Sequence, residues 1–248
     1  MKNKTKYLPI LTLICGLAGL ALRMWLLNSG VDAKGLLITT HPANVASYLL
    51  TALFLLVLLL AVRPLNAVSS YKKLYPPSVF ALIGCILAAA GIALSAVYEI
   101  LQRRDLIAML TLAVGFLAAV SLVLMGIGRK KGGRPNYLLH ACLCVYLMLH
   151  LINQYRLWSS DPQLQLYFFP LLASVFLMLS AYHGTVLSSQ KGSRRWYVFC
   201  NQAALFFCCL SLAGSAWFYY LLMGIFCLTN LCSLQVKPYR PKYLKEDA

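Results

Sequence analysis

The chain has 248 residues, of which 61% are hydrophobic and only 11% charged, and its mean hydropathy is +0.75. Soluble domains carry about 25% charged residues, enough to cover an apolar core with polar surface. This chain has too few of them, so the lipid bilayer must act as its solvent. The composition excludes a soluble enzyme, a secreted disulfide scaffold and a disordered protein.

Eight apolar runs follow one another along the chain, each near the length of about 20 residues with which a helix crosses a bilayer. They occupy residues 7–27, 46–62, 78–100, 106–127, 137–157, 166–187, 196–213 and 217–234. The first run is too long for the apolar part of a cleaved signal peptide. The pattern predicts an all-α, polytopic integral membrane bundle of eight transmembrane helices. It forms a single domain over residues 1–234, followed by a basic cytoplasmic tail at 235–248.

The distribution of charge predicts the orientation of this bundle. The chain holds 22 basic residues and 6 acidic ones, a net charge of +16. Seventeen basic residues fall at 2–6, 63–73, 129–134, 191–195 and 237–245, and the other five are Arg23, Lys34, Arg103, Arg104 and Arg156. Because cytoplasmic loops are enriched in Lys and Arg, both termini are expected in the cytoplasm and the protein in the cell membrane. This also accounts for the positive charge without a nucleic-acid partner.

Local residue choices agree with these boundaries. Pro42 and Pro77 stand near helix starts, where a missing backbone N–H costs nothing. Gly214 and Ser215 supply the turn between the last two runs. Aromatic residues crowd the expected interfaces: Trp217, Phe218, Tyr219 and Tyr220 outside, and Trp196 and Tyr197 inside.

The residues that commonly bind metals or form crosslinks do not make a site. All nine cysteines fall inside apolar runs and none forms a CxxC pair, so they are expected to act as small hydrophobic side chains. His41, His140 and His183 are too scattered for a metal set and are interpreted as interfacial or core residues. Three amide residues are interpreted as helix contacts: Asn201, Gln202 and Asn230. No cofactor is expected.

A faint internal repeat is visible in the loops. Arg23-Met24-Trp25 ends the first run and Arg156-Leu157-Trp158 ends the fifth. The loop that ends in Pro42 matches the one that ends in Pro162 at an offset of 120 residues, and Ser69 matches Ser188 at an offset of 119. These offsets predict two related four-helix halves, 1–131 and 132–234, with an axis along the membrane normal. Chance similarity between Ser-rich and Pro-rich loops is the alternative.

Glu99 is the only acidic residue inside the predicted spans, and polar groups in lipid are costly enough to be candidate sites. It ends a run whose small residues recur at spacings of three and four: Ala81, Gly84, Ala88, Gly91 and Ser95. Such a stripe lets another helix approach closely. Two interpretations are open. Glu99 faces an outward cavity and binds a cation or proton, or it pairs with Arg103 at i,i+4 on the surface.

The fifth run carries a polar stripe in its outer half. Tyr146, His150, Asn153 and Gln154 fall within about 100° of arc on a helix, and Arg156 flanks them near the surface. The stripe is a candidate for lining a solute site. The alternative is hydrogen bonding between helices, for which lipid-embedded proteins commonly use such residues.

Arg23 lies on the helix face of Gly16 and Gly19, about one turn from the outer end of the first run. One interpretation is that its side chain extends to the lipid headgroups. The others are pairing with Glu99, or binding of an anionic solute together with Arg156.

These residues support three functional hypotheses. The leading one is binding or transport of a small solute through an outward-facing polar cavity near Glu99, His150, Asn153 and Arg156. The second is a non-catalytic anchor or sensor subunit with a membrane or cytoplasmic protein partner. The third is a membrane-embedded enzyme acting through Glu99, His150 and Arg156, although no catalytic motif supports it. Polar residues around a cavity favour the first hypothesis, and buried, mutually paired polar residues favour the second.

Overall fold

The computed structural model describes residues 7–30, 37–38, 40–65, 77–102, 104–132, 136–159, 164–189 and 192–234. Within these ranges the chain forms eight α-helices, a short 3-10 helix and no β-strand. The α-helices are α1 (Leu8–Ser29), α2 (Pro42–Val62), α4 (Val79–Gln102), α5 (Leu106–Lys130), α6 (Tyr137–Trp158), α7 (Phe168–Ser188), α8 (Arg194–Ser211) and α9 (Trp217–Cys232), and the 3-10 helix η2 is Leu164–Tyr167. The all-helical fold class is confirmed.

Each of the eight apolar runs coincides with one helix, but the helices are not equally suited to lipid. Six segments are long and apolar enough to cross a membrane: α1, α2, α4, α5, α6 and Gln165–Ser188, which contains α7. Helix α9 has only 16 residues, and α8 begins with two arginines. The structure therefore supports a multi-pass integral membrane protein with six candidate spans, two fewer than the sequence predicted.

The ends of several helices follow from local residue chemistry. Pro42 stands in the first turn of α2, and the backbone N–H of Ala43 bonds to the ring of His41 at 3.3 Å. Asn136 caps α6 by accepting a 3.1 Å hydrogen bond from the N–H of Leu138. The predicted turn at Gly214 and Ser215 is confirmed, since α8 ends before it and α9 begins after it.

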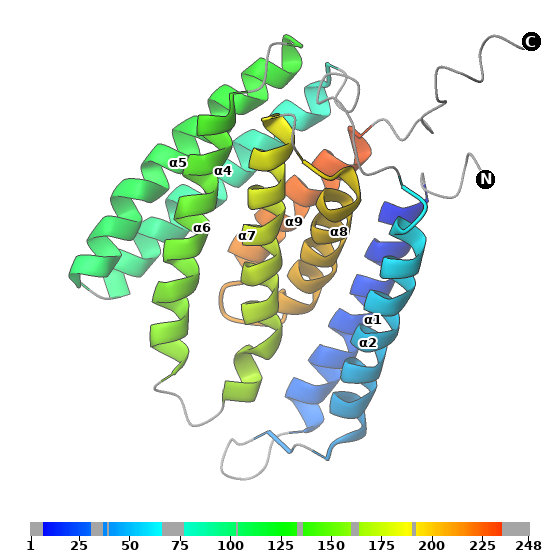
Figure 1. Cartoon of the computed structure of the whole chain (residues 1–248). Helices are drawn as coiled ribbons and strands as arrows, with labels where there is room; N and C mark the ends of the chain where they lie inside the picture. Colours follow the sequence, from blue (N-terminus) through cyan, green and yellow to red (C-terminus); the bar gives the residue numbers. More distant parts are fainter. Residues whose placement is uncertain are drawn as a thin grey trace, which may run out of the picture.

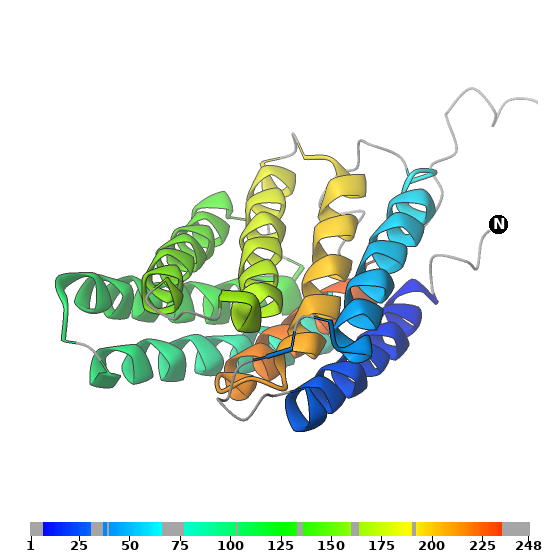
Figure 2. The ribbon, with the colours of Figure 1, turned by 90° about the horizontal axis from the view of Figure 1, so that it is seen from below.

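The helices form two layers, best seen in Figure 2: α5, α4, α9 and α1 in one, and α6, α7, α8 and α2 in the other. Successive helices run in opposite directions, so α1 begins and α9 ends at the same end of the bundle (Figure 1). We call it the basic end, because most basic residues in the described part of the chain lie there: Arg63, Arg129, Lys130, Lys131, Arg194 and Arg195. The other end is called the opposite end.

Helix α8 is the central helix of the bundle, in contact with α1, α2, α7 and α9. Every residue from Cys200 to Ser211 is buried. Phe206 stacks on Phe54 of α2 with ring centroids 4.2 Å apart, and Phe207 stacks on Phe176 of α7 at 5.3 Å. A helix that is covered by protein over most of its length need not be apolar enough for lipid, which is consistent with the place of α8 outside the six candidate spans.

The outer helices expose apolar side chains, as bilayer contact requires. Leu49 and Leu53 of α2, Leu101 of α4 and Leu117 of α5 are each more than half exposed. In water such a surface would drive aggregation, whereas lipid tails solvate it. These faces support contact with the lipid bilayer.

Small residues allow the closest helix contacts. A Cβ atom added at Gly84 of α4 would lie 1.9 Å from Oγ1 of Thr229 on α9, and one at Gly91 would lie 3.0 Å from Leu222. A Cβ atom at Gly16 of α1 would lie 2.8 Å from the Cβ of Cys209 on α8. The predicted stripe on the third run therefore packs against α9.

Several sequence predictions concern residues outside the described ranges. They include the tail at 235–248 and the loop residues 68–72 and 160–162 of the paired motifs. The division of 1–234 into halves 1–131 and 132–234 accordingly stays a prediction.

Candidate functional site

Glu99 lies at the centre of a buried hydrogen-bonded cluster that joins α4 to α6. Its Oε1 is 2.5 Å from Nδ1 of His150 and accepts a 3.2 Å hydrogen bond from Nε2 of Gln154. Its Oε2 accepts a 2.6 Å hydrogen bond from Nδ2 of Asn153. Because a carboxylate only accepts hydrogen bonds, the proton between Glu99 and His150 belongs on Nδ1 in this arrangement. We call these four residues the Glu99 cluster.

Aromatic rings enclose the Glu99 cluster. The ring of Tyr146 stacks on that of His150 with centroids 5.7 Å apart, and the ring of Tyr219 from α9 lies 4.6 Å from it. Glu99 is 3% exposed and His150 is 2% exposed. The polar stripe of the fifth run thus faces the interior of the bundle, and Glu99 is held by a neighbouring helix. Arg103, its alternative partner, lies outside the described residues.

Arg156 is not part of this cluster. Its Nη2 lies 3.5 Å from Oδ2 of Asp105, and both side chains are well exposed. An exposed ion pair of this length contributes about 0–1 kcal/mol. The structure thus separates Arg156 from the stripe that it flanks in the sequence.

Arg23 points into the bundle. It is 5% exposed, its Nη2 donates to the carbonyl oxygen of Leu166, and its guanidinium carbon lies 5.2 Å from the ring centroid of Phe169. The side chain of Arg23 thus contacts η2 and α7. This does not agree with the interpretation that it extends to the lipid headgroups. It forms no ion pair with Glu99 or any other acid in the described part of the chain.

A cavity of about 340 Å³ lies at the opposite end of the bundle, where α1, α6, α7, α8 and α9 meet. Its polar lining residues include Arg23, Gln154, Ser211, Ser215 and Tyr220, and its wall also includes Leu27, Trp158, Leu166, Tyr167 and Pro170. Gln154 belongs both to this lining and to the Glu99 cluster. The structure therefore brings five of the seven predicted site residues to the cavity or to the Glu99 cluster next to it, Tyr146 stacks on this cluster, and only Arg156 lies apart.

The cavity exists because the α8–α9 hairpin is short. Helices α8 and α9 have 18 and 16 residues, against 24 and 25 in α4 and α5. In Figure 1 the turn between α8 and α9 stops well above the lower ends of α1 and α7. Gly214, Ser215 and Ala216 of this turn are exposed and also line the cavity, so the cavity opens to the surface of the bundle.

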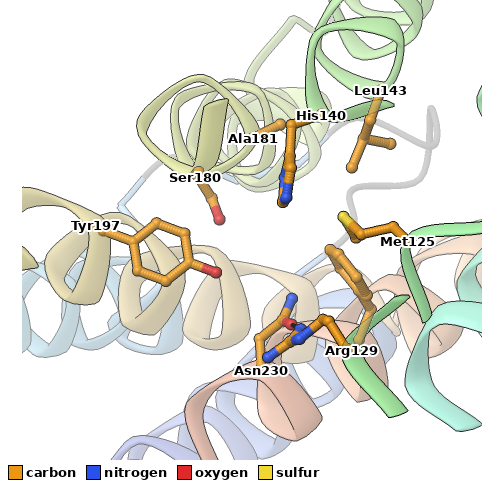
Figure 3. A pocket seen from close by; sticks show the side chains of 10 residues that line it. Met125, Arg129, His140, Leu143, Ser180, Ala181, Tyr197 and Asn230 are labelled. Carbon is orange, nitrogen blue, oxygen red and sulfur yellow. Dashed lines mark hydrogen bonds between the residues drawn. The ribbon is translucent and has the colours of Figure 1, made fainter. Parts of the chain in front are cut away.

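A second pocket lies at the basic end and is much smaller. Figure 3 shows His140 of α6, Ser180 of α7 and Tyr197 of α8 pointing toward a common centre, with Arg129 and Asn230 beside them. The pocket has a volume of about 10 Å³, which is space for about one water molecule. The two described pockets thus differ in volume, with about 340 Å³ at the opposite end and about 10 Å³ at the basic end.

Sequence reasoning missed Arg129 as a buried residue. The sequence pattern places Arg129 among the basic residues of a cytoplasmic loop. In the structure its side chain is 7% exposed at the end of α5. Its Nη1 donates to Oδ1 of Asn230, and its Nη2 donates a 2.7 Å hydrogen bond to Oγ of Ser233. Asn230 therefore forms the helix contact predicted for it, with a partner that the sequence did not indicate.

The aromatic belt at the opposite end is only half as predicted. Trp217 and Phe218 are exposed, but Tyr219 and Tyr220 are buried. Four consecutive aromatic residues cover a full turn of α9, so two of them face the bundle. Tyr219 packs on His150, and Tyr220 lines the cavity, with its hydroxyl 3.4 Å from the carbonyl oxygen of Pro170.

The remaining polar residues make helix contacts or lie apart. The hydroxyl of Thr12 on α1 donates a 2.6 Å hydrogen bond to Oε1 of Gln202 on α8. Among the described residues, no group of three His, Cys, Asp or Glu side chains is placed to hold a metal ion. Comparison of the chain with protein-family models, with curated proteins and with solved structures finds no match.

Proposed function

We propose that the protein is an eight-span membrane protein that binds a small solute in the cavity at the opposite end of the bundle and presents that cavity to the outside of the cell. The observation that carries the proposal is the cavity itself, because polar residues of α1, α6, α8, α9 and the α8–α9 turn meet around an opening inside an apolar bundle. Its volume of about 340 Å³ lies within the range of small-molecule sites.

Two facts support eight spans rather than six. At a rise of 1.5 Å per residue, α8 and α9 are about 27 and 24 Å long, close to the thickness of the hydrocarbon core. Each also runs along the bundle from the basic end toward the opposite end (Figure 1). With eight spans and the positive-inside rule, the basic end faces the cytoplasm and the cavity faces outward.

The contrast between the two described pockets favours transport over static binding. An alternating-access transporter that is open outward is packed on its inner side. The pocket between Arg129 and His140 has room for about one water, whereas the outer cavity can hold a solute. Transport would require the basic end to open in a second conformation.

The test uses the purified protein in lipid nanodiscs and a panel of amino acids, organic acids, sugars, nucleosides and amines. We expect some panel members to raise the melting temperature. Ser215→Trp places a large ring in the exposed cavity lining and should abolish this shift. Ser159→Trp, at an exposed turn of the same end that does not line the cavity, should retain it. A panel without effect, or shifts that survive Ser215→Trp, would refute solute binding in this cavity.

One observation favours the alternative of a non-catalytic membrane subunit. Both oxygens of Glu99 are satisfied by His150, Asn153 and Gln154, as expected for residues whose role is to hold helices together. On that hypothesis the cluster stabilises a surface for a protein partner. On this hypothesis Glu99→Gln would impair the assembly of a complex, and solute binding would not be part of the protein's function.

A further inference from the structure

Arg23 is a buried cation whose charge is not compensated by any acid in the described part of the chain. Only two acidic residues lie in that part, and each has other partners. Glu99 is bound by α6, and Asp105 pairs with Arg156 on the surface. A buried charge without a counter-ion is costly, and an ionisable residue inside a membrane bundle is therefore a candidate for binding a ligand of opposite charge.

The hydrogen bonds of Arg23 leave room for such a ligand. A guanidinium group carries five N–H donors in a planar fork. Among the described residues, only the carbonyl oxygen of Leu166 accepts a hydrogen bond from it. Arg23 also lines the cavity, so its free donors have access to whatever occupies that space. The fork matches the two oxygens of a carboxylate or phosphate.

The walls of the cavity add a second requirement. Trp158 and Tyr167 stack with ring centroids 5.0 Å apart and an interplanar angle of 13°, and both line the cavity. Leu27 and Pro170 extend this apolar wall. A bare inorganic anion would leave that surface without a partner, whereas an apolar or aromatic body would cover it.

We infer that the solute of this cavity is a small organic anion, with a carboxylate or phosphate group bound by Arg23 and an apolar or aromatic body packed against Trp158 and Tyr167. This inference rests on the proposed solute-binding function and specifies its ligand class. Arg156 has no part in it, because its ion pair with Asp105 lies on the exposed surface outside the cavity lining.

The test compares three probes on the full chain in a nonionic detergent, which carries no phosphate. Benzoate has the ring and the anionic group, benzamide has the same ring without charge, and glycerol 3-phosphate has the anionic group of a lipid headgroup without the ring. We expect benzoate to raise the melting temperature with saturable dependence on concentration, and benzamide to have little effect.

The variants assign the effect to Arg23. Arg23→Gln should weaken the apparent benzoate affinity by about tenfold or more, since a charge-assisted hydrogen bond is lost. Arg23→Lys retains the charge without the fork and should fall between Arg23→Gln and the unmodified protein, which keeps the test valid if Arg23→Gln does not fold. Arg104→Gln removes an exposed arginine of the same end and should change nothing.

Each contrary outcome overturns a different part of the inference. Equal shifts in melting temperature from benzoate and benzamide would overturn the requirement for an anionic group, while binding of a solute in the cavity would still stand. A shift in melting temperature from glycerol 3-phosphate with none from benzoate would overturn the requirement for an apolar or aromatic body. It would indicate that the site binds a lipid headgroup. Benzoate binding that Arg23→Gln leaves unchanged would overturn the role of Arg23. If neither these probes nor the solute panel stabilises the protein, the proposed function fails as well.

Discussion

The side-chain amide of Gln154 donates a 3.2 Å hydrogen bond to Oε1 of Glu99 and also forms part of the cavity wall. The buried carboxylate and the cavity are therefore neighbours through one side chain. A change in the charge of Glu99 would alter the orientation of Gln154 and so the surface that a solute meets. This relationship connects the two features of the molecule that bear most directly on its function.

Glu99→Gln is expected to destabilise the protein. The substitution replaces one acceptor oxygen with an NH2 group that faces either the donors of His150 and Gln154 or the donor of Asn153, so donor meets donor. Loss of a charged, buried hydrogen bond predicts a decrease of about 1.5–3 kcal/mol in the free energy of unfolding. Titration with denaturing detergent, followed by circular dichroism, measures it.

Asp105→Asn is the matched control for that measurement. It neutralises an acid at the same end whose ion pair with Arg156 is exposed. The change should stay within about 1 kcal/mol. If both substitutions have the same effect, the Glu99 cluster contributes no more than a surface pair and its structural importance is refuted.

Gly84→Ala is expected to force α4 and α9 apart. The added Cβ atom would lie 1.9 Å from Oγ1 and 2.8 Å from Cβ of Thr229, so rotation of the hydroxyl alone does not relieve the clash. Overpacking of this kind predicts a loss of about 1–3 kcal/mol in the free energy of unfolding. Gly128→Ala has no atom within 4 Å of the added carbon and should be neutral or stabilising. Equal stability of the two variants would argue against the close α4–α9 contact.

The hydrogen bond between Thr12 and Gln202 offers a test of how α1 is attached to α8. Thr12→Val and Gln202→Leu each remove one partner of the 2.6 Å bond, and the double variant removes both. Interhelical hydrogen bonds in membranes average about 0.6 kcal/mol and reach about 1.7. A double-mutant cycle in detergent should give a coupling energy in that range. A value of zero would mean that the two side chains do not interact.

The sequence alone predicts the helices and much of the polar cluster, for a physical reason. The apolar runs fix the number and order of helices, and the 3.6-residue period places Tyr146, His150 and Asn153 on one face of α6. Because an unpaired acid in lipid is costly, Glu99 required a partner, and this stripe was one of few available. The sequence therefore groups Glu99 with the stripe as candidate site residues, but it leaves pairing with Arg103 open and does not predict the direct hydrogen bonds to His150 and Asn153.

The features that the sequence did not predict depend on how deeply a side chain is buried and on packing between segments far apart in the chain. Arg129 lies at the end of α5 in a run of basic residues, and nothing local distinguishes it from the exposed Lys130 and Lys131. Its burial follows from the position of Asn230, which is 101 residues away. The cavity depends on how close the α8–α9 turn comes to the opposite end of the bundle. The lengths of α8 and α9 do not determine this position unless the tilt of both helices is also known.

Labelling of introduced cysteines decides whether the chain has the proposed orientation. Lys131 lies at the basic end and Arg104 at the opposite end, and both are exposed. In intact cells an impermeant thiol reagent should label Arg104→Cys and leave Lys131→Cys unlabelled until the membrane is permeabilised. The unmodified protein, with nine cysteines of which only Cys232 is exposed, supplies the background. The expected asymmetry follows from the excess of Lys and Arg at the basic end, since positive loops remain in the cytoplasm. Labelling of Lys131→Cys from outside would show that the bundle has the opposite orientation. The Arg23 cavity would then face the cytoplasm, and its ligand would be a cytoplasmic anion.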